Sequence, residues 1–147
     1  MLRYSRREHG TVLLLFPAAI LIMFVLGAVV IDVSLTHVRG DELEAVAGSA
    51  ANDALAGLDV VALRSGDGVR IDVDRAVDVA EAGIAAGPLP EAELIDLRVD
   101  VDGDGRTVIS VTLELTVDLV MAPAVGDLDS VTLRRTRSAT ILGSDLP

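Results

Sequence analysis

The sequence predicts an α+β fold in which one long N-terminal helix packs on a small antiparallel sheet of three or four strands. Three patterns lead to this prediction. An uncharged apolar block occupies residues 11–31, apolar residues recur at helical spacing over 32–57, and apolar and polar residues alternate over 94–121. The 147 residues have room for one anchor and one small domain, divided at about residue 32.

The apolar block is long enough to cross a lipid bilayer. Its residues, from Thr11 to Ile31, carry no charge, and a helix of this length spans about 31 Å. Its Leu, Ile, Val and Phe side chains supply about −4 to −8 kcal/mol of insertion free energy, which Pro17 and Gly27 reduce without reversing. Residues 11–31 are therefore predicted to be a transmembrane anchor. A cleavable secretory signal and a buried soluble helix are the alternatives, but the block exceeds the usual signal length and no convincing A-x-A site follows it.

Basic residues lie mainly on one side of this block. Three arginines precede it, namely Arg3, Arg6 and Arg7. Only Arg39 follows it closely. Because positively charged flanks stay in the cytoplasm, residues 1–10 are predicted to be a cytoplasmic stub and residues 32–147 an extracytoplasmic domain. The chain is expected to be a single-pass protein of a bacterial cell membrane, with its N-terminus in the cytoplasm.

The first segment beyond the anchor has the period of an amphipathic helix. Its apolar side chains share one face, at Leu43, Val46, Ala47, Ala50, Ala54 and Leu58. A helix is therefore predicted over 32–57 as a continuation of the transmembrane helix, with Gly40 as a candidate bend. The Ala-rich face can cover the domain's own sheet or pack against a neighbouring molecule, and the sequence leaves both open.

A turn, a strand and a second helix are expected next. The segment SGDG at 65–68 predicts a turn, and the alternation over 69–73 predicts a short strand. A helix capped by Asp72 or Asp74 should follow, and the Gly-Pro pair at 87–88 should end it.

The last third of the chain predicts an antiparallel meander. The segments 94–101 and 107–121 alternate on either side of the turn residues 102–105, which is the signature of a hairpin. Apolar residues occupy every odd position from Ile109 to Met121, so one face of this strand is expected to be buried. A further strand, rich in Thr and Arg, is predicted over 130–142. Its arginines, Arg134, Arg135 and Arg137, are expected to pair with nearby acidic residues.

Composition excludes several classes of function. The net charge of −11 should repel nucleic acid and anionic lipid. The chain has no cysteine, and its three aromatic residues all precede residue 32, so the domain lacks thiolates and stacking platforms for sugars or bases. His37 is the only histidine in residues 32–147, and these residues include no Lys or Tyr. The domain therefore lacks residues that common catalytic sites require. We expect no cofactor and no enzyme activity. An exported carboxylate-only hydrolase is a third hypothesis, and it needs two carboxylates within about 10 Å in a cleft.

One motif resembles a calcium loop. Three carboxylates alternate in it, from Asp100 through Asp102 to Asp104, and Gly105 occupies the sixth place. The twelfth place holds Val111 instead of the bidentate glutamate. A solvated hairpin turn is therefore the favoured interpretation, with the three aspartates as weak metal candidates.

The N-terminal third resembles a known family. The residues that carry the resemblance are Arg6-Arg7-Glu8-His9-Gly10-Thr11, the apolar run with Pro17, Asp32 directly after it, Glu42-Leu43, and Ala50-Ala51-Asn52-Asp53-Ala54-Leu55-Ala56-Gly57. Over residues 6–57 the chain is similar to TadE/TadG-like proteins of the Flp (tight adherence) pilus-assembly system. The resemblance implies a pilin-like outline, in which an N-terminal helix anchors the subunit and its outer half lies on a small sheet.

The resemblance also raises the question of peptidase processing. Related pilin-like chains are cleaved after a glycine and carry Glu five residues later, so Gly10 and Thr11 are the candidate cleavage position. Counting from Thr11, the fifth residue here is Leu15. The departure favours an uncleaved protein that stays in the membrane.

The leading hypothesis is a non-enzymatic structural or assembly component of a Tad/Flp-type pilus or secretion system. The expected partners are membrane lipid, other pilus-assembly or pilin-like membrane proteins, and copies of the chain itself through the N-terminal helix, with no nucleic acid. The alternative is a membrane-tethered extracytoplasmic binding or sensing domain, calcium-dependent or not, that is unrelated to pili.

Overall fold

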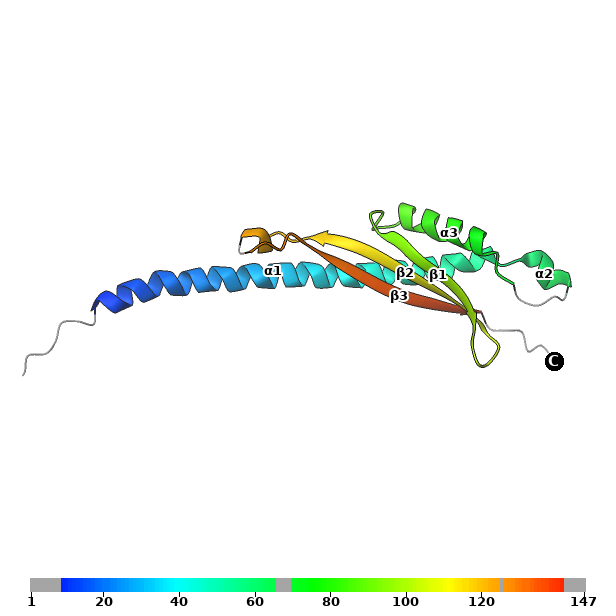
Figure 1. Cartoon of the computed structure of the whole chain (residues 1–147), viewed down its shortest axis with the longest axis horizontal. Helices are drawn as coiled ribbons and strands as arrows, with labels where there is room; N and C mark the ends of the chain where they lie inside the picture. The colour runs from blue at the N-terminus through cyan, green and yellow to red at the C-terminus, as the bar shows by residue number, and fades with distance from the viewer. Residues whose placement is uncertain (1–8, 66–69, 125, 142–147) are drawn as a thin grey trace, which may run out of the picture.

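The computed structural model describes residues 9–65, 70–124 and 126–141, and it has the predicted α+β layout. In chain order its elements are α1 (His9–Asp53), the 3-10 turn η1 (Ala54–Gly57), α2 (Val60–Ser65), α3 (Val73–Ala86), β1 (Glu93–Val101), β2 (Thr107–Asp118), the 3-10 turn η2 (Ala122–Ala124) and β3 (Ser130–Ile141). The sheet and α3 lie on the C-terminal half of α1 (Figure 1). The N-terminal half of α1 extends away from the rest of the described chain.

Helix α1 unites the predicted anchor and the predicted outer helix in one element of 45 residues. It passes through Pro17 and does not end at Gly40, the candidate bend, and Figure 1 shows only a gentle curve along its length. A glycine inside a helix costs only about 1 kcal/mol relative to alanine, which the packing of the domain easily offsets. The turn η1 continues the helix to Gly57, so the prediction of helical structure over 32–57 is confirmed.

The sheet has three antiparallel strands in the order β1-β2-β3, within the predicted number. Strands β1 and β2 form the predicted hairpin, which closes through the hydrogen bond from the Gly105 amide to the Asp102 carbonyl, with Gly105 at a φ of 75°. Glycine adopts this left-handed conformation without the penalty that other residues meet. The register of β1 against β2 shifts between Leu94 and Asp96, which marks a bulge.

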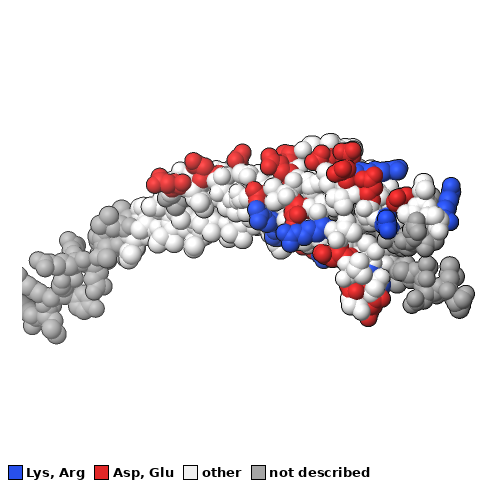
Figure 2. Space-filling view, turned by 45° about the vertical axis from the view of Figure 1, so that its right-hand side comes forward, with Lys and Arg blue, Asp and Glu red and all other residues white. Residues whose placement is uncertain are grey.

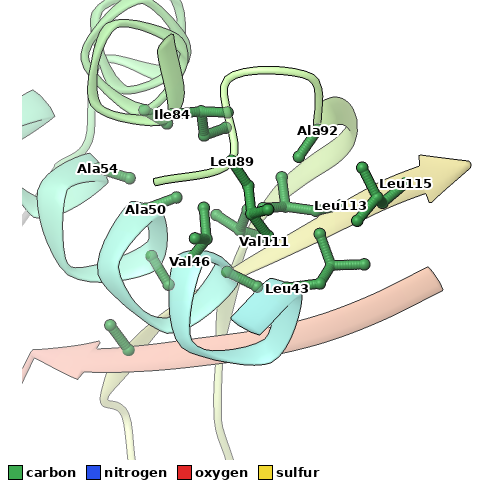
Figure 3. Close-up of a cluster of buried hydrophobic side chains, with 14 of the residues drawn as sticks. Leu43, Val46, Ala50, Ala54, Ile84, Leu89, Ala92, Val111, Leu113 and Leu115 are labelled. Carbon is green, nitrogen blue, oxygen red and sulfur yellow. The ribbon is translucent and has the colours of Figure 1, made fainter. Parts of the chain in front are cut away.

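The core lies between the sheet and the two helices α1 and α3, as Figure 3 shows. Strand β2 supplies its odd-numbered residues, as predicted: Ile109, Val111, Leu113, Leu115 and Val117. Helix α1 supplies one face, made of Leu43, Val46, Ala47, Ala50, Ala51 and Ala54. Helix α3 adds Ala76, Ala80 and Ile84. The Ala-rich face of α1 is thus covered by the domain's own sheet and by α3, where small side chains permit close approach.

The opposite face of the sheet is polar. Its hydroxyl groups pair across β2 and β3, with Ser110 and Ser138 2.9 Å apart and Thr112 and Thr136 2.9 Å apart. Cross-strand pairs of this kind stabilise a sheet by a few tenths of a kcal/mol to about 1 kcal/mol each. This face contributes stability through pairing along the strands and contributes nothing to the apolar core.

The predicted strand over 69–73 is wrong. Val69 lies outside the described residues, Ile71 forms a single bridge with Leu58, and Val73 already begins α3. The reason is the cap at Asp72, whose carboxylate accepts a hydrogen bond from the Arg75 amide at 3.1 Å. The predicted helix with an Asp72 cap is confirmed, and it takes the residues that a strand would have needed.

Two further features of the structure differ from the prediction, the end of β2 and the presence of helix α2. Strand β2 ends at Asp118 instead of residue 121, because the next amides bond elsewhere, and Met121 is not part of the core. Helix α2 was not predicted at all. The Asp59 carboxylate begins it by accepting hydrogen bonds from the amides of Val61 and Ala62.

Replacing Gly57 with alanine is expected to destabilise the domain. A Cβ atom at this position would lie 2.8 Å from the Ala76 Cβ and 2.9 Å from the Asp72 carbonyl oxygen, so backbone would have to move. We expect the free energy of unfolding to fall by about 1–3 kcal/mol, the usual cost of overpacking. Urea titration of the full chain in detergent, followed by circular dichroism, measures it.

The matched control is Gly48→Ala on α1. A Cβ atom there meets nothing within 4 Å, so the higher helix propensity of alanine should raise the free energy of unfolding by up to about 1 kcal/mol. Equal effects of the two substitutions would contradict the described contact between η1 and α3.

Candidate functional site

The N-terminal half of α1 presents an apolar surface to its surroundings. Its large side chains are exposed, including Leu15, Phe16, Leu21, Ile22, Met23, Phe24 and Leu26. Residues 15–31 carry no charged side chain, whereas Figure 2 shows acidic and basic residues at many points on the domain. Among the described residues, α1 is the one helix that is long and apolar enough to cross a membrane. An exposed apolar surface of this extent marks a contact with lipid or protein.

Asp32 is the first residue after the apolar run, and it fixes the domain to α1. Its side chain is almost fully buried, with 6% of the residue exposed. Its carboxylate accepts hydrogen bonds from three successive backbone amides in the connection between β2 and β3: Val120 at 2.9 Å, Met121 at 3.1 Å and Ala122 at 2.6 Å. Successive amides that converge on one anion form a nest. We call this arrangement the Asp32 clamp.

The clamp also settles the ionisation of its carboxyl group. Burial raises the pKa of Asp32, but the hydrogen bonds from the Met121, Val120 and Ala122 amides lower it, and the net pKa lies below the ordinary value of 3.8. The Asp32 carboxylate is therefore ionised at neutral pH and engaged with backbone donors. It is a structural anion rather than a free acid or base.

The domain is expected to lose stability in acid. The pKa values of Asp32 and Asp102 are lowered in the folded state, Asp102 first by a hydrogen bond from the Arg106 amide. Their contributions are complete above the unfolded-state pKa, about 3.9, and are lost as the pH falls through the folded-state values. The urea midpoint of the full chain should therefore drop below about pH 4. The drop should be smaller in Asp32→Asn, and an equal drop would contradict the role of Asp32.

An apolar groove lies beside the clamp, between α1 and the connection from β2 to β3. It has a volume of about 640 Å³ and opens to the surface. Its lining residues are Ala28, Val29, Asp32, Val33, Thr36, His37, Leu119, Met121, Ala122, Gly126, Leu128, Val131, Leu133 and Arg135. We call it the junction groove. Its size falls within the usual range for sites that hold small molecules, about 300–1,000 Å³.

The polar edge of the junction groove carries cationic and hydroxyl side chains. The Thr36 hydroxyl donates to the Asp32 carbonyl at 2.8 Å, and His37 lies 3.8 Å from Asp41. The Arg135 guanidinium is 4.0 Å from Glu44, whose other oxygen contacts Arg137.

The predicted pairing of the β3 arginines with nearby acids is confirmed. Arg135 and Arg137 face Glu44 of α1, while Arg134 lies on the opposite face of the sheet and pairs with Glu114 at 2.7 Å. Alternate residues of a strand point to opposite faces, which explains this division.

The candidate calcium ligands are not brought together. Asp102 and Asp104 both bind Arg106, at 2.8 Å and 2.9 Å, and Asp100 lies in β1 opposite Val108. Within the described ranges, the structure holds no group of three His, Cys, Asp or Glu side chains that could bind a metal ion. Residues 102–105 form a hairpin turn, which is the structure predicted from Val111 in the twelfth place of the motif.

The other predicted positions lie along α1. Gly10 and Thr11, the candidate cleavage position, belong to its first turn, and Pro17, Gly27 and Ile31 lie within its apolar half. The contact of Asp32 with the β2–β3 connection and the groove beside it were not predicted from the sequence. The available signal was a lone carboxylate directly after an apolar run, whereas nothing in the segment around residues 120–122 marks those amides as its partners.

Comparison with protein-family models, with curated proteins and with solved structures finds no match to the chain. The chemistry of the junction is therefore inferred from the side chains and amides at the Asp32 clamp and the junction groove. The junction holds one carboxylate that accepts hydrogen bonds from three backbone amides, an aliphatic groove, and the guanidinium of Arg135 at the edge of that groove. Such a site suits binding and positioning.

Proposed function

We propose that the chain is a non-enzymatic, membrane-anchored structural or assembly component of a Tad/Flp-type pilus or secretion system. Residues 11–31 anchor it in a bacterial cell membrane, residues 1–10 stay in the cytoplasm, and residues 32–147 lie outside. The observation that carries the proposal is the double use of α1: its exposed apolar half continues, without a break, into the helix on which the domain's core is built.

A helix used in this way suits a subunit that must be held at a fixed orientation. A flexible linker would let the domain rotate freely, whereas α1 and the Asp32 clamp tie the sheet to the direction of the anchor. An assembly component needs its neighbours at defined positions. The pilin-like outline and the motifs at residues 6–57 support the same proposal.

The site chemistry supports a non-catalytic role. The one carboxylate that is buried at the junction, Asp32, is engaged by three amides. His37 is exposed on the surface of α1, 3.8 Å from Asp41. Binding to lipid and to protein neighbours accounts for the exposed surfaces without a reaction.

Deleting the gene should test the role in assembly. We expect cells without the protein to lose the Flp-type filaments that shearing releases, and the full chain to restore them. A Leu21→Arg variant should not restore them, because Arg at the centre of a spanning helix costs about 2.5–3.5 kcal/mol of insertion. The control is Val61→Arg, at an exposed position on α2. Undiminished filaments in the deletion strain would contradict the proposal.

Intact-mass analysis with terminal sequencing of the protein from its native membrane decides how the N-terminus is used. The proposal expects no cleavage between Gly10 and Thr11, because Leu15 occupies the place of the glutamate that pilin-like substrates carry. A new N-terminus at Thr11 would instead place the chain among processed filament subunits.

A further inference from the structure

The junction groove straddles the level at which the proposed anchor leaves the bilayer. With Ile31 at the outer boundary, Ala28 and Val29 lie about 3–5 Å below that boundary, at 1.5 Å per residue. Thr36 and His37 lie about 8–9 Å above it, within or just outside the headgroup layer. Both pairs of residues line the same groove. The lower end of the groove therefore lies within the lipid, and its upper end lies at or above the headgroup layer.

The lining matches the chemistry of a phospholipid. The walls are mainly aliphatic, with Val33, Leu119, Leu128, Val131 and Leu133 among them. Their exposure would otherwise leave an apolar surface in contact with water above the bilayer. An acyl chain that rises along α1 covers these side chains.

The edge of the groove supplies a partner for a phosphate group. The Arg135 guanidinium lies over Gly40, where a Cβ atom would come within 2.9 Å of its Nη2 atom. Its Nη1 donates to the Arg134 carbonyl at 3.0 Å, and Nε is 4.0 Å from Glu44, a pair at the limit of an ion-pair contact. Arginine forks are well suited to phosphate oxygens.

Charges of the opposite sign lie in the loop beside the groove. Asp127 and Asp129 flank Leu128, which lines the groove, and both are exposed. They disfavour an anionic headgroup, whereas a zwitterionic headgroup offers its phosphate to Arg135 and its ammonium group to the carboxylates. The charges thus fit a zwitterionic phospholipid.

We propose that the junction groove binds one acyl chain of a zwitterionic membrane phospholipid, drawn up between α1 and β3, with its phosphate at Arg135. This proposal rests on the proposed function, since it requires residues 11–31 to span a membrane. A second copy's apolar helix is the competing occupant. That helix carries no charge over 11–31, so it would bring no anionic group to the Arg135 edge.

A photo-crosslinking experiment tests the occupant directly. Photo-leucine replaces Leu133 in the full chain, which is reconstituted in phosphatidylcholine vesicles and irradiated, and the products are identified by intact mass. We expect a lipid adduct at Leu133, which lines the groove. A covalent dimer, or no adduct, would overturn the proposal. Photo-leucine at Leu55, which packs against the distal core, is the negative control.

Two pairs of variants sharpen the result. Ala28→Phe fills the lower end of the groove and should reduce the adduct several-fold, whereas Val30→Phe, outside the lining and exposed, should not. Arg135→Gln should reduce it as well, whereas Arg134→Gln, on the opposite face, should not. Equal yields within both pairs would overturn the assignment of the groove.

The test separates this proposal from the one on which it rests. Resistance of the protein to alkaline extraction from the vesicles reports insertion. A chain that inserts and gives no lipid adduct overturns the groove proposal alone. A chain that alkali extracts overturns the proposed anchor, and the groove proposal with it.

Discussion

Replacing Leu43 with alanine is expected to lower the free energy of unfolding by about 2–5 kcal/mol, the range for large-to-small changes in cores. Leu43 is fully buried, and it points from α1 toward the side chains of Leu113 and Leu115 on β2 (Figure 3). Truncation removes apolar contacts and leaves a cavity between helix and sheet, which rigid neighbours on both sides prevent from collapsing. A small domain with a total stability near 5–10 kcal/mol loses a large part of it.

Urea titration of the full chain in detergent measures this loss, and circular dichroism is the suitable signal because the domain has no aromatic residue. Val38→Ala, on the exposed side of the same helix, is the control, because Val38 is 53% exposed. Its effect should stay within about 0.5 kcal/mol. A similar loss in both variants would mean that α1 does not carry the core.

Replacing Asp32 with asparagine is expected to release the connection between β2 and β3 from α1. Asparagine keeps the size of the side chain, but it removes the charge and directs an NH2 group toward amides that are themselves donors. The amides of Val120, Met121 and Ala122 lose a charged acceptor, which is stronger than a neutral one. Hydrogen exchange of these three amides should accelerate by about tenfold or more.

Hydrogen-exchange mass spectrometry of the full chain in detergent provides the measurement. Amides of the β1–β2 hairpin are the internal reference, since they lie at the far end of the sheet from the clamp. Asp41→Asn is the control variant, because the Asp41 side chain is 69% exposed and, among the residues that the structure describes, its ion pair is with His37. Unchanged exchange at residues 120–122 in Asp32→Asn would contradict the clamp.

The consequence of the clamp for the whole molecule is a fixed geometry between the apolar half of α1 and the sheet. The carboxylate that ends the apolar run also ends β2, because it draws three amides out of the strand pattern. Movement of the anchor is thereby coupled to the sheet. For a subunit that assembles with neighbours in the membrane, this coupling transmits the packing of the anchors to the arrangement of the outer domains.

The sheet could be predicted from the sequence because β2 alternates strictly from Ile109 to Asp118, and a turn with Gly105 precedes it. Helices α1 and α3 could be predicted, α1 from the apolar block with the amphipathic segment after it and α3 from the cap at Asp72. In these elements the local pattern and the tertiary packing favour the same structure.

The remaining elements depend on contacts that no local pattern records. The alternation over 69–73 is typical of a strand, but a strand needs a partner, and Ile71 finds only Leu58. In the Asp32 clamp, Asp32 contacts amides that lie 88 to 90 positions further along the chain. The groove arises from the same long-range contact, so it too could not be predicted from periodicity or motifs.

In the proposed function, residues 11–31 span the membrane and hold the domain outside the cell. The chain has no cysteine, so single-cysteine variants can be labelled without background, by a membrane-impermeant maleimide applied to spheroplasts. With this orientation we expect rapid labelling of Val61→Cys on α2 in intact spheroplasts, and labelling of Ser5→Cys only after lysis. Labelling of Ser5→Cys in intact spheroplasts, or protection of Val61→Cys until lysis, would contradict it.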